Sequence, residues 1–214
     1  MKSLLILPLA FFSLMSCAQQ SGSEDLDKPS QETLDSLQTA YFASGCFWCV
    51  EAVFESVDGV AEAVSGYAGG DKPNPNYQVV SSGNSRHAET VKVYYDSTKV
   101  SFETLVEVFF NSHDPSTKDS QGPDNGPQYR SIAFYQNENE ASIIRKKIEE
   151  YRAAETFSRI TTEVTELEKF YDAEDYHQDY ERLHPNQGYI KSVSIPRLNK
   201  FKKKMPWVLK DGVH

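Results

Sequence analysis

The sequence predicts a single α+β domain. Its 214 residues are enough for one globular core and few for two. Stretches with the two-residue alternation of a strand are mixed with stretches that have the wider apolar spacing of a helix. The regular strand–helix–strand alternation that builds a parallel sheet is absent, so the mixture favours the α+β class.

Residues 1–16 predict a lipoprotein-type signal peptide. They carry one charge, Lys2, and an apolar run from Leu4 to Leu14 that is too short to span a membrane. The segment Leu14-Met15-Ser16-Cys17 resembles the lipobox of bacterial lipoproteins. We therefore expect cleavage before Cys17 and a lipid on its thiol, with an ordinary signal peptide cut nearby as the alternative.

The predicted signal peptide and lipid lead to two further expectations, a flexible tether and a location at a membrane. Residues 17–38 are rich in Ser, Gln, Asp and Glu and predict a flexible tether to a domain at residues 39–198. The protein is expected to be exported, monomeric and anchored by its lipid to a membrane of the bacterial cell envelope, on the periplasmic or outer-membrane side.

The charge of the chain disfavours nucleic acid as a partner. The net charge is −9, and it becomes −10 once Lys2 leaves with the signal peptide. Phosphate binding depends on clustered cations. The exception is a group of four lysines at positions 200, 202, 203 and 204, which predicts a solvated basic tail over residues 199–214. A weak contact with anionic lipid or a partner is the alternative.

Apolar spacing, caps and alternation place the elements of the domain in order. Ser101 is a predicted N-cap, and Asn137 with Glu140 resembles a capping box. The long polar loop at 113–128 is of the kind that is usually functional. The expected elements are a strand at 39–44, a helix at 46–57, a strand at 60–70, a loop at 71–83, a strand at 89–95, a helix at 101–110, that long loop, a strand at 130–135, a helix at 137–154, a strand at 161–166 and an aromatic stretch at 170–180.

Cys46 and Cys49 are the only cysteines left after processing. Cys46 lies where a strand turns into a helix, and a helix N-terminus stabilises a thiolate, so we expect its pKa to be lowered. Cys49 follows three residues later, on the same helix face, and the pair can close a local disulfide. Phe47 and Trp48 between them favour an apolar group, such as a methyl, beside the attacked atom.

Two structural alternatives compete with a redox pair. The cysteines are either a disulfide staple in a lipoprotein binding module or half of a zinc site. Zinc needs about two further ligands. The five histidines, at 87, 113, 177, 184 and 214, show no paired spacing near the cysteines, so no metal is predicted.

Five segments in order along residues 39–196 carry a family resemblance. They are Gly45-Cys46-Phe47-Trp48-Cys49-Val50-Glu51, Gly66-Tyr67-Ala68-Gly69-Gly70 with Asn74-Pro75-Asn76-Tyr77, Arg86-His87-Ala88-Glu89, Asp124-Asn125-Gly126-Pro127-Gln128-Tyr129-Arg130-Ser131, and Ala173-Glu174-Asp175-Tyr176-His177-Gln178-Asp179-Tyr180. Together they resemble the class A peptide-methionine sulfoxide reductase family. The resemblance implies a two-layer α/β plait, a mixed sheet with helices packed on it.

The resemblance also implies a reaction. Cys46 attacks the sulfoxide sulfur, methionine is released and a sulfenic acid stays on Cys46. Glu89 matches the acid that protonates the departing oxygen, with its pKa raised by burial. The hydroxyls of Tyr77 and Tyr129 match groups that hydrogen-bond this oxygen.

Substrate choice is implied by three further matches. Asp124 matches a polar group that orders the site, and Phe47 and Trp48 match a cage for the S-methyl group. The expected substrate is methionine-S-sulfoxide, free or within proteins, because the cage excludes the mirror form. Tyr176 and His177 are as consistent with a supporting role as with a catalytic one.

Cys49 departs from the commonest family pattern, in which many members have Gly at this position and recycling cysteines in a C-terminal tail. Residues 185–214 contain no cysteine. We therefore expect a Cys46–Cys49 disulfide that thioredoxin or a similar dithiol opens, without a metal or organic cofactor. The alternative enzyme is a general exported thiol–disulfide oxidoreductase built on the same pair.

Overall fold

The computed structural model describes residues 28–212. The predicted signal peptide, Cys17 and the first part of the predicted tether lie outside the described residues. None of the described helices is both long and apolar enough to cross a membrane.

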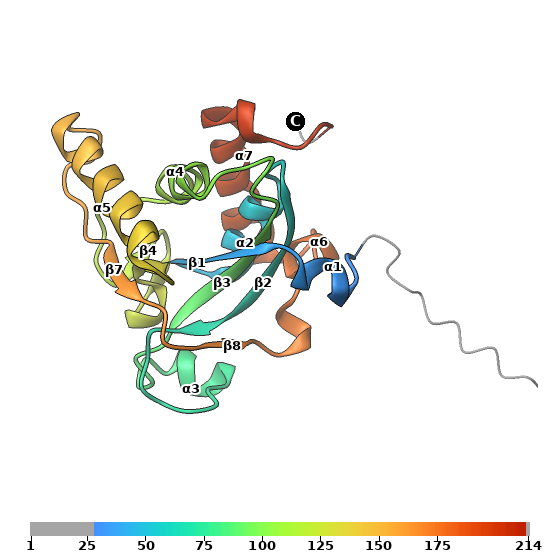
Figure 1. Cartoon of the computed structure of the whole chain (residues 1–214). Helices are drawn as coiled ribbons and strands as arrows, with labels where there is room; N and C mark the ends of the chain where they lie inside the picture. Colours follow the sequence, from blue (N-terminus) through green and yellow to red (C-terminus); the bar gives the residue numbers. More distant parts are fainter. Residues whose placement is uncertain (1–27, 213–214) are drawn as a thin grey trace, which may run out of the picture.

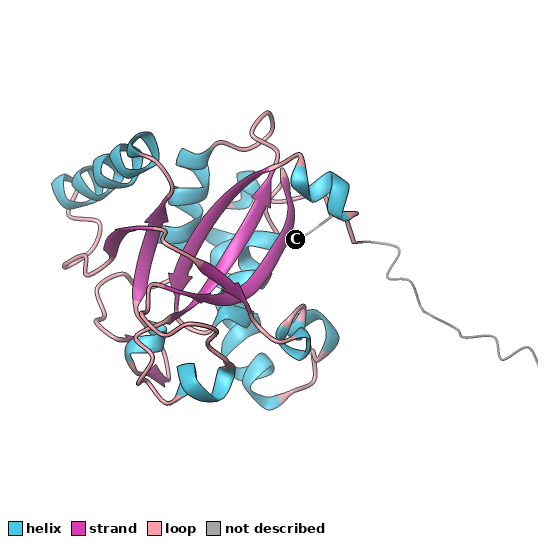
Figure 2. Ribbon diagram, turned by 60° about the horizontal axis from the view of Figure 1, so that its bottom comes forward, coloured by secondary structure: helices cyan, strands magenta, loops and turns pink. Residues whose placement is uncertain are grey.

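A six-stranded mixed sheet forms the centre of the domain (Figures 1 and 2). The pair β6–β7 is parallel and the other neighbours are antiparallel. The order across the sheet is β7 (Glu163–Glu166), β6 (Ser131–Tyr135), β1 (Gln38–Ser44), β3 (Ala88–Tyr95), β2 (Val60–Ala68) and β8 (Phe170–Asp172). The predicted α+β class, with a mixed sheet and helices in one domain, is confirmed.

Helices pack on one face of this sheet and enclose the main core (Figure 1). Phe42 of β1 stacks on Phe54 at 5.0 Å and on Phe109 at 5.1 Å between ring centroids, which joins the sheet to two helices. A smaller cluster around Ile132 and Phe134 lies on the other face. The covering helices are α2 (Phe47–Glu55), α4 (Phe102–Ser112), α5 (Glu138–Ala153) and α7 (Ile195–Lys204).

The predicted caps and strand faces agree with the structure. Ser101 accepts a hydrogen bond from the Thr104 amide at 3.1 Å, and Asn137 accepts one from the Glu140 amide at 3.0 Å. The alternation along β3 buries the side of the strand that carries Val91 and Val93 against α2. These local signals are strong because caps and two-residue alternation depend on few neighbours.

The two ends of the domain differ from the expectations. Within the predicted tether, residues 31–35 form α1 (Gln31–Asp35), and Lys28 forms an ion pair with Asp179. The expected basic tail is wrong, because α7 and the following turn η4 (Pro206–Val208) fold onto the domain. Phe201 and Met205 are four residues apart and bury a common apolar face that outweighs the charge of the lysines between them.

Two predicted loops also contain short elements. The loop at 71–83 includes α3 (Tyr77–Ser81), which Asn76 caps. The long loop at 113–128 folds as a small hairpin of β4 (Ser120–Gln121) and β5 (Asp124–Asn125), followed by the turn η1 (Pro127–Tyr129). The C-terminal part adds η2 (Asp175–His177), α6 (Tyr180–Leu183) and η3 (Ile190–Ser194).

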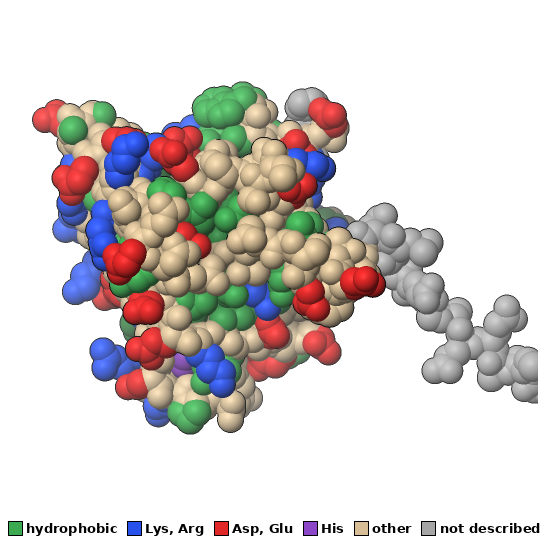
Figure 3. All heavy atoms as spheres, viewed as in Figure 1, with side chains coloured by type: hydrophobic (Ala, Val, Ile, Leu, Met, Phe, Trp, Pro, Cys, Tyr) green, Lys and Arg blue, Asp and Glu red, His purple; other side chains and the backbone are tan. Residues whose placement is uncertain are grey.

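Charged side chains of both signs are interspersed on the face shown in Figure 3. Ion pairs link some of them, such as Arg152 with Glu149 at 2.7 Å along the outer side of α5. Such exposed pairs contribute about 0.2–1 kcal/mol each. The stability of the fold therefore rests on the aromatic core rather than on its surface charges.

Candidate active site

Cys46 is the N-cap residue of α2, directly after β1. Gly45 precedes it with φ +90°, a conformation that glycine adopts without strain, and a Cβ on Gly45 would lie 2.7 Å from that of Gln121. The Cys46 carbonyl accepts hydrogen bonds from the amides of Cys49 and Val50 at 3.1 and 3.3 Å, which begins the helix. The predicted position of Cys46 at the strand-to-helix turn is confirmed.

Glu89 lies beside this turn, on the face of β3 that packs against α2. Its Oε2 accepts a hydrogen bond from the Phe47 amide at 3.0 Å, and the side chain is 2% exposed. Burial raises the pKa of Glu89 to about 8, although the bond from Phe47 acts in the opposite direction. At neutral pH the Glu89 carboxyl beside Cys46 therefore holds a proton.

Tyr77 and Tyr129 reach the same place from two separate loops. Tyr77 is the first residue of α3 and Tyr129 the last of η1. Burial raises the pKa of both hydroxyls, and the charges of Glu89 and Cys46 raise it further. Both phenols therefore stay protonated near Glu89 and are able to donate hydrogen bonds.

Four rings form an aromatic cluster beside Cys46, made of Phe47, Trp48, Tyr77 and His177. His177 lies at its centre, with its ring centroid 4.9, 5.8 and 4.6 Å from those of the other three in that order. Its two ring nitrogens are buried without a hydrogen-bond partner among the described residues, and burial lowers its pKa. A neutral His177 therefore contributes a ring to this wall, with the Glu174 carboxylate 3.9 Å from its Nε2. The sequence alone left this role open.

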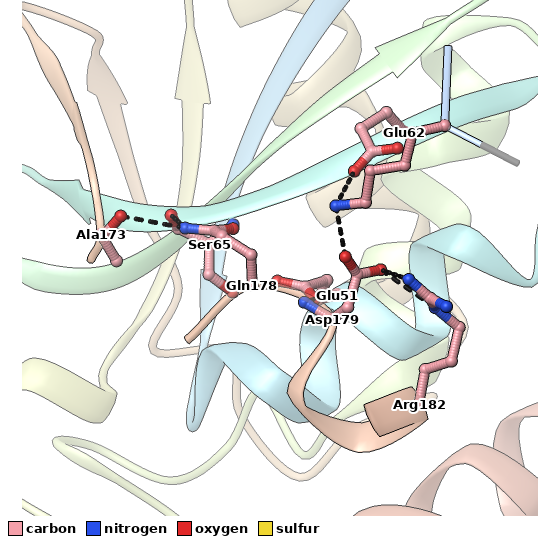
Figure 4. A network of polar contacts seen from close by, with 8 residues as sticks. Glu51, Glu62, Ser65, Ala173, Gln178, Asp179 and Arg182 are labelled. Atoms are coloured by element: carbon pink, nitrogen blue, oxygen red, sulfur yellow. Dashed lines mark hydrogen bonds and ion pairs between the residues drawn. The ribbon is translucent and has the colours of Figure 1, made fainter. Parts of the chain in front are cut away.

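A polar clamp holds the segment that carries His177 (Figure 4). The Glu51 carboxylate accepts hydrogen bonds from the Ser65 hydroxyl and the Asp179 amide. The Gln178 side chain accepts from the Ser65 amide at 2.9 Å and donates to the carbonyls of Ser65 and Ala173 at 3.0 and 3.1 Å. These bonds join η2 to α2 and β2, and thereby fix the aromatic cluster.

Carboxylates in this clamp also form the best candidate for a cation site. Oxygens of Glu51, Glu55 and Asp179 lie within 4.8 Å of one another. Asp179 is already paired with Lys28 and with Arg182, the latter at 3.0 Å. The cations of the protein therefore balance this cluster, which does not include either cysteine.

Cys49 shares Tyr189 with Cys46 and has Arg197 as a further neighbour. The Tyr189 hydroxyl lies 3.8 Å from the Cys49 sulfur and donates a hydrogen bond to Asp124 at 2.5 Å. A hydrogen bond with Cys46 is the largest cause that lowers the pKa of Cys49 to about 6, and the positive charge of Arg197 adds to it. Burial acts in the opposite direction. The environment of Cys49 therefore favours its thiolate.

Burial acts against the expected lowering of the Cys46 pKa. Both cysteines are free thiols, and burial raises the pKa of Cys46 well above its ordinary value. The N-terminus of α2 offers partial positive charge, but the cost of burying a thiolate is larger at this depth. The two sulfurs share one hydrogen bond, so charge on Cys49 also disfavours charge on Cys46.

Sequence reasoning missed Tyr189 and Arg197. The Arg197 guanidinium is fixed by hydrogen bonds to the Ser112 carbonyl at 2.7 Å and the Ser44 hydroxyl at 3.1 Å. The available signal was the four-residue spacing of Val193, Arg197 and Phe201, which is typical of a helix. All the predicted site residues that the structure describes lie around the first turn of α2, with Asp124 connected to it through Tyr189.

Comparisons with known proteins agree with this arrangement. A family model described as peptide methionine sulfoxide reductase matches residues 38–208. The peptide methionine sulfoxide reductase MsrA 1 of Rhodopirellula baltica is 48% identical over 77% of this chain and 85% of its own. The enzyme MsrA of Nautilia profundicola is 47% identical over 77% of this chain and 94% of its own.

Solved structures of similar proteins share the fold. Mxr1 of Saccharomyces cerevisiae in its reduced form has a TM-score of 0.66 and 34% identity, over 70% of this chain and 87% of that chain. Methionine sulfoxide reductase A of Corynebacterium diphtheriae has a TM-score of 0.63 and 35% identity, over 70% and 76%. These matches do not support the alternative of a general thiol–disulfide oxidoreductase. The chain belongs to the peptide methionine sulfoxide reductase family, and it is an oxidoreductase that reduces methionine sulfoxide in the repair of oxidised proteins.

Proposed function

We propose that Cys46 is the nucleophile of this reduction and that Glu89 is its acid. As the sulfoxide binds, the Cys46 proton passes to the Cys49 thiolate along their shared hydrogen bond. The Cys46 thiolate attacks the sulfoxide sulfur, while the Glu89 carboxyl gives its proton to the sulfoxide oxygen. This attack forms a transient bond between the two sulfurs. The hydroxyl then moves from the substrate sulfur to the Cys46 sulfur and the sulfur–sulfur bond breaks, which releases methionine and leaves a sulfenic acid on Cys46.

The side chains around Cys46 orient the substrate. The hydroxyls of Tyr77 and Tyr129 donate hydrogen bonds to the sulfoxide oxygen near Glu89, and Asp124 orders the polar side of the site. The aromatic cluster takes the S-methyl group, which leaves one orientation for the oxygen. The substrate is therefore methionine-S-sulfoxide, free or in an oxidised protein, and the R epimer does not fit.

Cys49 completes the cycle as the resolving cysteine. Its thiol attacks the Cys46 sulfenic acid, a disulfide forms and water leaves. A dithiol such as thioredoxin supplies two electrons and reopens the disulfide, so no metal or organic cofactor takes part. The support is the position of both cysteines in the first turn of α2 and the absence of any cysteine after position 49 in the sequence.

The place of action is part of the same proposal. Cys17 carries the lipid, residues after it connect the domain to the membrane, and the protein works as a monomer on the exported side of the bacterial envelope. The lipobox-like segment Leu14-Met15-Ser16-Cys17 supports this location.

The observation that carries the proposed mechanism is the buried Glu89 carboxyl, bonded to the Phe47 amide beside Cys46. Each sulfoxide epimer is supplied separately with a dithiol to the wild type and to Cys46→Ser. We expect the wild type to reduce the S epimer only and Cys46→Ser to reduce neither. Equal reduction of both epimers, or activity in Cys46→Ser, would contradict the proposal.

A further inference from the structure

A cavity of about 650 Å³ opens beside Cys49, away from the acid and the aromatic cluster. Its walls come from the end of α4, the β4–β5 hairpin and α7. Cys49 and Tyr189 are part of its lining, whereas Cys46, Glu89 and Tyr77 are not. Of the two redox sulfurs, Cys49 is therefore the one that faces this space.

The size of the cavity fits a small molecule or the reacting end of a larger one. Ligand pockets commonly measure about 300–1,000 Å³. Cys49 is 1% exposed, so its sulfur belongs to the floor of the cavity and only a slim group reaches it. A thiolate on a short side chain meets this condition.

The cavity carries more positive than negative charge, although the chain as a whole has a net charge of −9. Arg197, Lys200 and Lys204 line it, together with Asp114 and Asp124. Both lysines are exposed, and neither forms an ion pair with the carboxylates of residues 28–212. Asp124 already accepts the hydrogen bond of Tyr189, and Asp114 those of Ser116. Lys204 lies over the Phe157 ring at 5.7 Å, a contact that leaves its ammonium group open to an anion, so both lysines are available to an anionic ligand.

We propose that this cavity is the access site of the reductant, that the reductant's thiolate attacks the Cys49 sulfur there, and that Lys200 and Lys204 favour a thiol carrying carboxylates. This inference rests on the proposed Cys46–Cys49 disulfide and adds the sulfur that is attacked, the side of approach and the charge of the reductant. An anionic thiol is attracted by the lysines and is brought to Cys49, the one of the two redox cysteines that lines the cavity.

The electrons and atoms of this step balance. The reductant's sulfur forms a bond to Cys49, the Cys46–Cys49 bond breaks, and Cys46 leaves as a thiol with the proton of the Glu89 carboxyl. A second thiolate of the reductant then attacks the reductant's own bound sulfur, and Cys49 leaves as a thiolate. Leaving is fast for a thiol whose pKa is lowered, as the environment of Cys49 provides.

The test begins from the disulfide form and uses no sulfoxide, so its failure is distinct from failure of the sulfoxide chemistry. The full chain with Cys17→Ser is oxidised to the Cys46–Cys49 disulfide, and its opening is measured with two monothiols. Mercaptosuccinate carries two carboxylates and 2-mercaptoethanol is neutral. A monothiol cannot close on itself, so the mixed disulfide persists long enough for its position to be mapped by fragmentation in a mass spectrometer.

We expect the mixed disulfide on Cys49. We also expect Lys200→Gln with Lys204→Gln to lower the ratio of the mercaptosuccinate rate to the 2-mercaptoethanol rate by roughly threefold to tenfold, less at high salt. Lys203→Gln is the matched control, because Lys203 is exposed on the same helix and does not line the cavity. A mixed disulfide on Cys46, a ratio that the double variant leaves unchanged, or an equal fall with Lys203→Gln would overturn the proposal.

Failure of the disulfide to form under mild oxidation would overturn this inference together with the proposed recycling step. Reduction of methionine-S-sulfoxide in a single turnover would still stand in that case. The two results therefore separate the chemistry of Cys46 from the route of the reductant.

Discussion

Cys46 and Cys49 are three residues apart on one helical turn, yet their surroundings differ in charge and polarity. Cys46 lies against a buried carboxyl and aromatic rings, and burial raises its pKa. Cys49 faces a cavity with cations, and its pKa is lowered to about 6. The difference indicates a division of work, in which one sulfur receives the oxygen of the substrate and the other exchanges electrons with the reductant.

Glu89→Gln, a substitution beside Cys46, is expected to cause the largest loss of activity. The amide keeps the shape of the side chain but holds no acidic proton, so we expect kcat/KM for methionine-S-sulfoxide to fall by roughly 10²–10⁴-fold. Steady-state kinetics measure this. Glu62→Gln, a partly exposed carboxyl on the neighbouring strand β2, is the control and should stay close to the wild type. A wild-type rate for Glu89→Gln would show that the proton comes from another group.

In the unaltered protein, the dependence of activity on pH tests the protonation states assigned to Glu89 and Cys49. Activity needs a protonated Glu89, and its pKa is raised to about 8, so activity falls as pH rises through 8 and is about tenfold lower one pH unit above it. The Cys49 thiolate speeds the step by taking the Cys46 proton, so activity also falls as pH drops through about 6. A rate of the sulfoxide step that stays constant from pH 5 to pH 10 would contradict both assignments.

The smallest effect tests the positive charge beside Cys49. With Cys17→Ser and Cys46→Ser, Cys49 is the remaining thiol, and the pH midpoint of its alkylation is measured. We expect Arg197→Gln to raise that midpoint by about one pH unit, because an opposite charge favours the thiolate. Arg159→Gln is the matched control, since Arg159 also donates to a main-chain carbonyl, that of Ser116, but lies away from the cysteines. An unchanged midpoint in Arg197→Gln would show that the charge of Arg197 does not lower the pKa of Cys49.

The sequence predicted the Cys46 side of this comparison better than the Cys49 side. Capping and alternation placed the turn before α2 and the strand of Glu89, because both signals depend on residues close in the chain. The neighbours of Cys49 lie about 140 residues further on, as Tyr189 does. Their position depends on how α7 packs. The lysines of that helix led to the prediction of a solvated tail instead.

The ionisation of the pair could not be predicted for a related reason. A helix N-terminus predicts a thiolate at Cys46, but the outcome depends on burial and on the second sulfur. Burial is a property of the assembled domain rather than of one turn. The aromatic cluster shows the same limit, because the ring contact between Phe47 and His177 joins residues that are far apart in the chain.

The most direct test of oxygen transfer to Cys46 is a single turnover in Cys49→Ser. The variant also carries Cys17→Ser, so that Cys46 is the only cysteine. The variant is mixed with excess methionine-S-sulfoxide and dimedone, which labels sulfenic acids, and without a reductant. We expect one equivalent of methionine and one label, on Cys46, per protein, formed more slowly than in the wild type because no Cys49 thiolate takes the Cys46 proton. Methionine formed without a label on Cys46, or no methionine at all, would contradict the claim that Cys46 takes the oxygen.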